Sequence, residues 1–272
     1  MGRPEEAHFI SGEQLRFSGK GFLLEPHLVD IPQEHRHSPI VAQMHQPWNL
    51  ENYQVPRSFL VVCDVPQTDR AFFGSPCLTI PTMPIKIPDG DQFKIPSEFS
   101  QFKSTMQMII DHQAGINSRW KEYYAYINVD QRSTEKGRSQ RKPGTHVDGA
   151  QFDKDSNPYP NTCFPELEYT VSNALPTTFF PGQKIDFSDM DTSAPDALAQ
   201  FNRLLVAQVD RSSAVAGDPY SVYFFDPYVP HEATVAQQAT ERTFFKMFFS
   251  QRRLVSSGFN SVPLVNPLLP DF

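Results

Sequence analysis

The chain has 272 residues, of which 39% are hydrophobic and 20% are charged, and its formal net charge is −7. This length and hydrophobic content allow a folded domain with a core, which excludes a chain that is disordered throughout. The acidic balance disfavours a uniformly basic nucleic-acid-binding protein, and the apolar runs are shorter than the roughly 18 residues expected of a membrane helix.

Proline is the most informative part of the composition, because 25 of the 272 residues are proline. Proline breaks helices and is tolerated at turns and strand ends, so this content favours many short strands over a helical bundle. We expect a mainly β (α+β) fold, a β-barrel or double-sheet jelly roll with flanking helices. The expected organisation is a single domain over 1–272, with N-terminal strands and a supporting helix in 1–119, a β core in 120–250 and an extended C-terminal segment in 251–272.

The cysteines and the first residues indicate the compartment. Cys63, Cys77 and Cys163 are odd in number and widely spaced, which favours neither a disulfide framework nor a zinc site. The opening residues MGRPEEAHFI lack the basic-then-apolar pattern of a secretion signal. We therefore expect a reduced, cytoplasmic protein without a membrane partner.

In chain order, the first predicted elements are short strands at Gly21–Leu24 and 58–62. The histidines of HRH at 35–37 lie in a polar, proline-rich stretch, and we expect them to be exposed rather than metal ligands. Apolar residues three or four apart predict a helix over 97–113, with Ser97 as its N-cap and one face on a sheet.

From residue 120 onward the pattern favours strands, interrupted by a helix over 195–208 that has proline in its first turn. The strand segments are rich in aromatic and β-branched residues. They cover 120–129, 168–173, 177–180, 220–225 and 242–249.

The segment 131–142, QRSTEKGRSQRK, carries five basic residues and one acidic residue. A run of this kind is most often a solvated loop. A second interpretation, which stays open, is a segment over a binding site that attracts an anionic substrate.

The motif THVDG at 145–149 is the first feature that indicates chemistry. Side chains two positions apart leave an extended strand on the same face, so His146 and Asp148 would lie together. An imidazole and a carboxylate are two thirds of the facial ligand set that non-haem Fe(II) uses.

A third ligand and an anion anchor follow at the end of the chain. The predicted strand 220–225 is followed by a turn that leads to His231, and Arg242 begins the last predicted strand. The planar guanidinium of arginine can hold both oxygens of a carboxylate. Lys246, on the same face of that strand, is the alternative anchor.

This order of residues resembles the non-haem Fe(II)/2-oxoglutarate-dependent dioxygenase superfamily, whose pattern is HxD…H followed by arginine about ten residues later. The similarity covers roughly residues 120–250. It implies a double-stranded β-helix in which His146, Asp148 and His231 bind Fe(II) and Arg242 binds the distal carboxylate of 2-oxoglutarate. Tyr126, on a strand flanking the site, is a further candidate donor to 2-oxoglutarate.

The resemblance also implies the reaction, an O₂-dependent oxidation that releases succinate and CO₂. Hydroxylation of a small polar metabolite, such as an amino acid or a natural-product intermediate, is the expected activity. Asp148 disfavours halogenation, because halogenases of this superfamily typically have alanine or glycine at that position. One departure is Phe244, which stands where some branches have a serine two places after the arginine.

The sequence is compatible with different substrates and with different uses of the metal. The same chemistry could act on a protein side chain or a nucleic-acid base, although a nucleic-acid partner is disfavoured because only 132–142 offers a cationic track. A cupin-like metal-binding protein without 2-oxoglutarate, or a β-barrel binding protein with a vestigial site, would also match the motif. The sequence does not indicate the oligomeric state or which carbon is oxidised.

Overall fold

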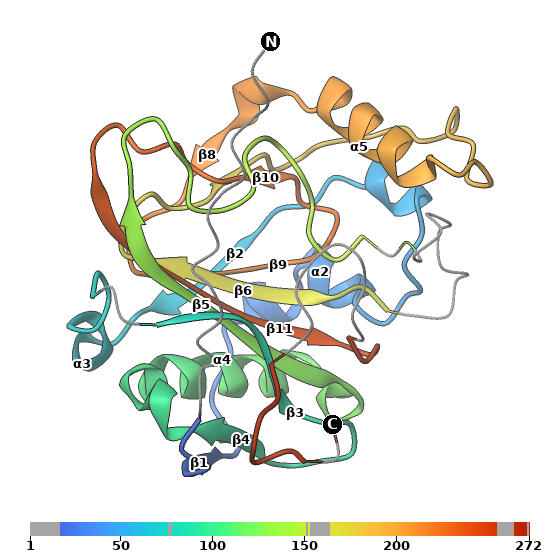
Figure 1. Cartoon of the computed structure of the whole chain (residues 1–272). Helices are drawn as coiled ribbons and strands as arrows, with labels where there is room; N and C mark the ends of the chain where they lie inside the picture. Colours follow the sequence, from blue (N-terminus) through green and yellow to red (C-terminus); the bar gives the residue numbers. More distant parts are fainter. Residues whose placement is uncertain (1–16, 76–77, 151, 153–163, 255–263, 271) are drawn as a thin grey trace.

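The computed structural model describes residues 17–75, 78–150, 152, 164–254, 264–270 and 272 (Figure 1). Cys77 and Cys163 lie outside the described residues, as do 255–263 of the predicted C-terminal segment. Cys63 is a free, partly buried thiol. In the described part of the chain, no helix combines the length and the apolar character needed to cross a membrane.

The framework is a six-stranded antiparallel sheet in the order β2-β9-β6-β11-β5-β3. Its long central pair, β5 and β11, stays in register from Thr240 opposite Thr134 to Ser250 opposite Tyr124. The strands are β2 (Leu60–Asp64), β3 (Thr79–Lys86), β5 (Tyr124–Thr134), β6 (Leu167–Ser172), β9 (Ser221–Phe225) and β11 (Thr240–Ser250).

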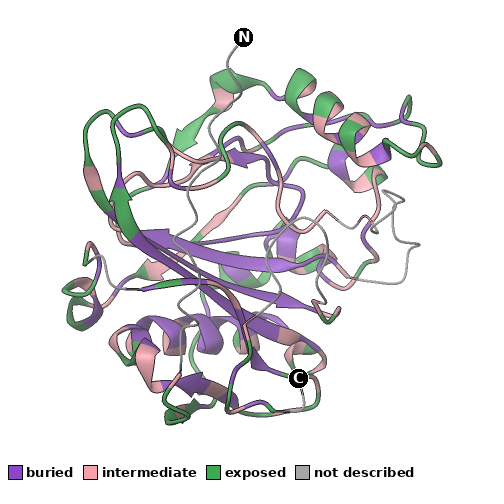
Figure 2. Cartoon of the chain, in the orientation of Figure 1, coloured by how far each residue is buried: buried purple, intermediate pink, exposed green. Residues whose placement is uncertain are grey.

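The two faces of this sheet differ because side chains alternate along a strand. Phe245 and Met247 of β11 belong to the main core, together with Met106 and Ile109 of helix α4 (Lys103–Ile116). Figure 1 shows α4 below the sheet, and Figure 2 shows that the sheet and much of this helix are buried. The opposite face carries Arg242, Phe244 and Lys246, and this is the face that holds the candidate site.

A smaller antiparallel sheet covers that second face. It has the order β10-β7-β8, formed by β10 (His231–Glu232), β7 (Thr178–Phe179) and β8 (Val215–Ala216). Phe179 packs against Tyr223, Phe225 and Val229 between the two sheets. The structure therefore confirms the mainly β, two-sheet fold that the sequence predicts.

The other elements surround these sheets. Helix α5 (Ala197–Gln208) packs Phe201 and Leu205 into an aromatic cluster with Trp48 and Tyr53. β1 (Gly21–Leu24) pairs with β4 (Phe93–Pro96). The short elements are α1 (Gln33–Arg36), α2 (Pro39–Gln43), α3 (Gln67–Arg70), and the 3-10 turns η1 (Glu51–Gln54), η2 (Ser97–Phe102), η3 (Trp120–Glu122) and η4 (Arg211–Ser213).

Several boundaries differ from the sequence prediction. The helix expected over 97–113 begins as the 3-10 turn η2 and becomes α4 at Lys103. Ser97 is not its N-cap, because its hydroxyl lies 3.1 Å from the hydroxyl of Ser18 instead. β5 begins four residues later than the expected strand and runs on to Thr134, so the start of the basic segment is strand rather than loop.

The prediction that both histidines of HRH are exposed is wrong for His35, which is buried. His35 Nδ1 lies 3.1 Å from Nε2 of His112, and His112 Nδ1 lies 2.9 Å from the Tyr169 hydroxyl. That hydroxyl donates to Gln113 Oε1 at 2.8 Å, so it accepts from His112. A neutral His112 with its proton on Nδ1 satisfies the chain of hydrogen bonds, because Nε2 then accepts from His35.

We expect His112 to make folding sensitive to acid. Burial, followed by the charge of His35, lowers the pKa of His112 to about 3, whereas an unfolded chain has a histidine pKa of about 6.5. The stability contributed by neutral His112 is complete above about pH 6.5 and is lost as the pH falls towards the folded pKa, by up to about 1.4 kcal/mol per pH unit. Urea unfolding at about pH 7 and about pH 5 should show a smaller pH dependence in His112→Gln than in the wild type. His37 is exposed, so His37→Gln is the control and should keep the wild-type dependence of stability on pH. An equal pH dependence of stability in the wild type and in His112→Gln would contradict this role of His112.

Candidate metal centre and adjoining cavity

Main-chain pairing brings the two histidines of the site together. The amide of His146 donates to the carbonyl of His231, and the amide of His231 donates to the carbonyl of His146, both at 2.9 Å. Residues directly opposite each other in an antiparallel pair point to the same face. Their imidazole centroids accordingly lie 4.7 Å apart, although the residues come from different parts of the chain.

Each imidazole is oriented by a main-chain carbonyl. His146 Nδ1 donates to the carbonyl of Gly144 at 2.8 Å, and His231 Nδ1 donates to the carbonyl of Val229 at 3.1 Å. A carbonyl only accepts, so Nδ1 of each ring carries a proton, and in the neutral imidazole the lone pair is on Nε2. Burial, and next the neighbouring His231, lower the pKa of His146 to about 4, so His146 is neutral at pH 7.

Asp148 completes the cluster two residues after His146. Its Oδ1 lies 3.9 Å from His146 Nε2, and its Oδ2 lies 3.8 Å from His231 Nε2. One ligand atom from each of the three residues lies within 4.8 Å of the others, so the group could hold a metal ion. Two neutral imidazole nitrogens and a carboxylate are the donors of the facial Fe(II) ligand set, and the residues therefore fit this metal.

Gly149 allows the chain to turn immediately after Asp148. Its φ of +70° lies in the left-handed region that glycine favours. A Cβ atom at this position would lie 3.0 Å from Cβ of Glu166 and 3.2 Å from Cγ of Pro227. The backbone conformation and the close packing at position 149 therefore both favour glycine immediately after the ligand Asp148.

Lys246 connects the side chain of Asp148 to that of Glu168. Lys246 Nζ lies 2.8 Å from Asp148 Oδ2 and 2.7 Å from Glu168 Oε2. Burial is the main cause that raises the pKa of Glu168 to about 8, against the opposing attraction of Lys246. The ammonium group is thus held between Asp148 and Glu168 and does not line the cavity, whereas buried Arg242 does.

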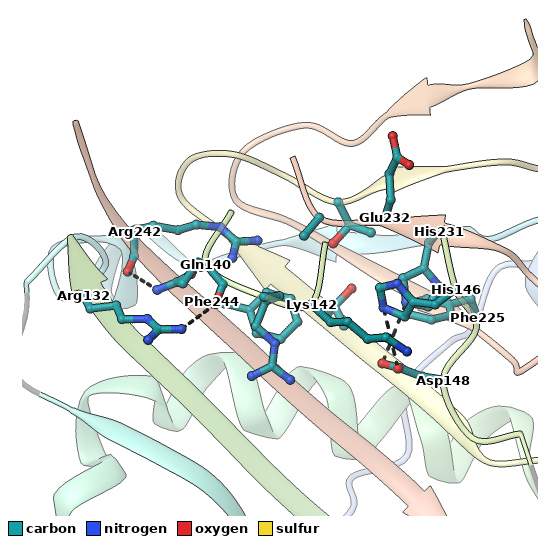
Figure 3. A pocket seen from close by; sticks show the side chains of 14 residues that line it. Arg132, Gln140, Lys142, His146, Asp148, Phe225, His231, Glu232, Arg242 and Phe244 are labelled. Atoms are coloured by element: carbon teal, nitrogen blue, oxygen red, sulfur yellow. Dashed lines mark hydrogen bonds and ion pairs between the residues drawn. The ribbon is translucent and has the colours of Figure 1, made fainter. Parts of the chain in front are cut away.

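A cavity of about 570 Å³ adjoins the three ligands. Figure 3 shows His146, Asp148 and His231 on one side, and Arg242, Gln140 and Arg132 on the other. The lining residues are Arg132, Gln140, Arg141, Lys142, His146, Asp148, Thr170, Thr177, Phe225, His231, Glu232, Ala233, Arg242 and Phe244.

Arg242 is buried and held in a defined orientation. Its Nε donates to the carbonyl of Ala174 at 2.9 Å, and its Nη1 donates to Gln140 Oε1 at 2.6 Å. Within the described residues, no group accepts a hydrogen bond from Nη2. Burial, and next the charge of Arg141, lower its pKa to about 9, so the guanidinium is still a cation at pH 7. It therefore presents a charged edge to the cavity.

Tyr126 lies elsewhere on the same sheet face. Its hydroxyl accepts a hydrogen bond from the amide of Leu254 at 2.8 Å, and its ring stacks on Phe248 with centroids 4.9 Å apart. Tyr126 is not among the residues that line the cavity. Of the five site residues predicted from the sequence, the structure brings His146, Asp148, His231 and Arg242 to one cavity, and it places Tyr126 against the C-terminal segment.

Sequence reasoning did not identify Glu168 or Gln140 as parts of the site. A glutamate inside the strand LEYTVS was a detectable signal, because charged residues are rarely buried without a partner. Gln140 gave no signal, since it lies in a basic segment whose composition is typical of a loop. In the structure it is buried, and its Nε2 donates to the carbonyls of Asp130 and Arg242.

A buried ion pair supports the turn that carries His231. Arg57 Nη1 donates to Asp226 Oδ2 at 2.8 Å, with both side chains almost fully buried. Asp226 Oδ1 accepts from the amide of Tyr228 at 3.0 Å, and the amide of Val229 donates to the carbonyl of Asp226. Because the carbonyl of Val229 orients the His231 imidazole, Arg57 acts on the ligand through this turn.

Comparisons with known proteins give only remote structural similarities. No protein-family model and no curated protein match the sequence. The chain is similar to EvdO2 from Micromonospora carbonacea var. aurantiaca, at a TM-score of 0.43 and 12% identity over 89% of this chain and 99% of that chain. It is similar to EctD from S. alaskensis with bound Fe, at a TM-score of 0.38 and 13% identity over 91% and 88% of the two chains. It is also similar to AviO1 from Streptomyces viridochromogenes Tue57, at a TM-score of 0.36 and 9% identity over 86% of this chain and 100% of that chain. Similarities this remote assign no function, so the function rests on the residues of this site.

Removing one partner of the buried ion pair should destabilise the protein. Arg57→Ala leaves the carboxylate of Asp226 buried without its cation, and we expect the free energy of unfolding to fall by about 3–5 kcal/mol. Arg70→Ala is the matched control, because Arg70 is partly exposed and lies 3.7 Å from the exposed Asp64; its effect should stay within about 1 kcal/mol. Chemical denaturation measures both effects, and equal losses in the two variants would contradict the role given to Arg57.

Proposed function

We propose that this protein is an Fe(II)/2-oxoglutarate-dependent oxygenase that hydroxylates a small polar molecule. One observation carries the proposal: a single cavity has three metal-ligating side chains on one side and a buried, oriented arginine on the other. The first group fits Fe(II), and the second fits a carboxylate.

The residues present define how the reactants would be held. His146 and His231 would bind Fe(II) through Nε2 and Asp148 through one carboxylate oxygen, leaving positions open for other ligands. Arg242 would pair with the distal carboxylate of 2-oxoglutarate. When bound together, Fe(II), 2-oxoglutarate and O₂ supply an oxidation of a substrate C–H bond, with succinate and CO₂ as co-products.

The surroundings of the ligands maintain this arrangement. The carbonyls of Gly144 and Val229 hold the two imidazole rings, so that Nε2 of each ring faces Asp148. Phe225 packs edge-on against the ring of His231, with centroids 5.0 Å apart. Such an apolar shell limits the access of water to a metal centre and strengthens the electrostatic interactions inside it.

The size of the cavity supports a small molecule as the substrate. Its volume of about 570 Å³ lies within the roughly 300–1,000 Å³ that small-molecule sites occupy. An amino acid or a natural-product intermediate would fit in this volume beside 2-oxoglutarate.

The metal and co-substrate can be tested by spectroscopy without knowing the substrate. Anaerobic addition of Fe(II) and then 2-oxoglutarate should produce a visible metal-to-ligand charge-transfer band. His146→Ala and Asp148→Ala should lose the band, because each removes a ligand, and the exposed variant His37→Ala should keep it. Fe(II) binding without the band would favour a cupin-like metal protein that does not use 2-oxoglutarate. Binding of neither would contradict the proposed function.

Binding of 2-oxoglutarate by Arg242 should be separable from binding of Fe(II). Arg242→Gln removes a charge-assisted contact, and we expect the Kd for 2-oxoglutarate, titrated by the same band, to rise about 10- to 150-fold with Fe(II) affinity retained. Arg242→Lys keeps the charge and tests whether the fork is needed. Arg203→Gln, at an exposed arginine of α5, is the control. An unchanged Kd in a folded, iron-binding Arg242→Gln protein would remove Arg242 from the co-substrate site.

A further inference from the structure

The basic segment provides more positive charge to the cavity than one carboxylate requires. Arg132, Arg141 and Lys142 line the cavity together with Arg242. The same segment leads directly into the metal-ligand motif, because only three residues separate Lys142 from His146. Cations and metal ligands are therefore joined in one stretch of main chain beside the same cavity.

Arg132 is already partnered by the protein. Its Nη2 lies 3.0 Å from Asp130 Oδ2 and also donates to the carbonyl of Gln140. By contrast, Arg141 and Lys142 form no ion pair with any residue in the part of the chain that the structure describes. Two cations at the cavity are thus not ion-paired to the described part of the protein, although Asp148 and Glu232 also line the cavity.

Arg141 shares its packing surface with the proposed anchor. Its guanidinium carbon lies 5.0 Å from the centroid of the Phe244 ring, and that of Arg242 lies 5.0 Å from the same centroid. Arg141 and Arg132 both lower the pKa of Arg242, whereas Asp130 raises it. The three guanidinium groups therefore repel one another, with Asp130 as the only carboxylate among these electrostatic partners.

Lys142 extends the positive charge towards the metal ligands. Figure 3 shows its side chain running along the cavity towards Asp148, with Arg242 and Arg132 on the far side. Arg141 lies beside Phe244 and Arg242, so the two cations extend from the Arg242 end of the cavity towards the metal ligands. The distal carboxylate of 2-oxoglutarate would neutralise Arg242 and would leave partly buried Arg141 and exposed Lys142 able to bind a further anion.

We propose that Arg141 and Lys142 form a second anion subsite, and that the oxidised substrate carries a carboxylate or phosphate group bound there. The identity of this anion as the oxidised substrate rests on the proposed function, whereas the subsite itself does not. The basic segment is accordingly a specificity element of the cavity, and it selects acids over neutral molecules of the same size.

The subsite can be tested with small anions on the intact chain. Inorganic phosphate and acetate are titrated by calorimetry into protein saturated anaerobically with Fe(II) and 2-oxoglutarate, so that the anchor at Arg242 is filled. We expect one site for at least one of these anions, weakened about tenfold in Arg141→Gln and in Lys142→Gln. Tighter binding of phosphate indicates a phosphorylated substrate, and tighter binding of acetate indicates a carboxylic acid.

The same segment offers matched controls. Lys136 and Arg138 are exposed, belong to the same basic run and do not line the cavity. Lys136→Gln and Arg138→Gln should leave anion binding unchanged. Equal weakening in these controls, or the absence of an anion site in the wild-type protein, overturns the subsite.

Two further measurements separate this inference from the proposed function. If the charge-transfer band does not form, the proposed function fails, and the titration is repeated on metal-free protein, where the four variants still test the subsite. If the band forms, succinate release is compared for acids and their neutral amides or alcohols. Turnover of acids, with a lower kcat/KM in Arg141→Gln, supports the substrate class, and turnover of the neutral compounds alone overturns it.

Discussion

The candidate site depends on two main-chain hydrogen bonds between His146 and His231. This bridge attaches the first residue of the HxD motif to the smaller sheet, where β10 also pairs with β7. Opposed residues of an antiparallel pair share a face, so the bridge sets the distance between the imidazoles. The carbonyls of Gly144 and Val229 then set the orientation of the rings and the location of their protons. An arrangement of side chains that could hold a metal ion thus follows from backbone pairing.

The large sheet serves two purposes because β11 alternates its side chains. Phe245 and Met247 pack in the core below the sheet, whereas Arg242 and Lys246 project from the other face. Buried charges are costly unless they are partnered, and both cations have partners. Lys246 is held between Asp148 and Glu168, and Arg242 is held by Gln140 and the carbonyl of Ala174. The buried cations of this face are therefore stabilised by protein groups. The side-chain nitrogen of Arg242 that has no acceptor among the described residues is Nη2.

Much of the site was predictable because its residues occur at spacings that strand geometry explains. Two positions along an extended segment place His146 and Asp148 on one face, and an apolar strand and a turn precede His231. The positions of His35 and Tyr126 were not accessible in this way. His35 is buried because His112, from a helix distant in sequence, accepts its hydrogen bond, and the Tyr126 hydroxyl contacts the main chain of Leu254. Burial and partners of this kind depend on packing between distant segments, for which a single sequence has no periodic signal.

The sequence by itself determined the mainly β class, the approximate strands and the set of residues that could ligate a metal. Local backbone preferences and alternation depend on neighbouring residues, so they can be read without a fold. Only the tertiary structure decided which cations are ion-paired and which are available at the cavity, because ion pairing depends on which carboxylates come close to each cation. Lys246 pairs with Asp148 and Glu168, Arg132 pairs with Asp130, and Arg141 and Lys142 form no ion pair among the described residues. Charge is a property of the sequence, but its neutralisation is a property of contacts made across the fold.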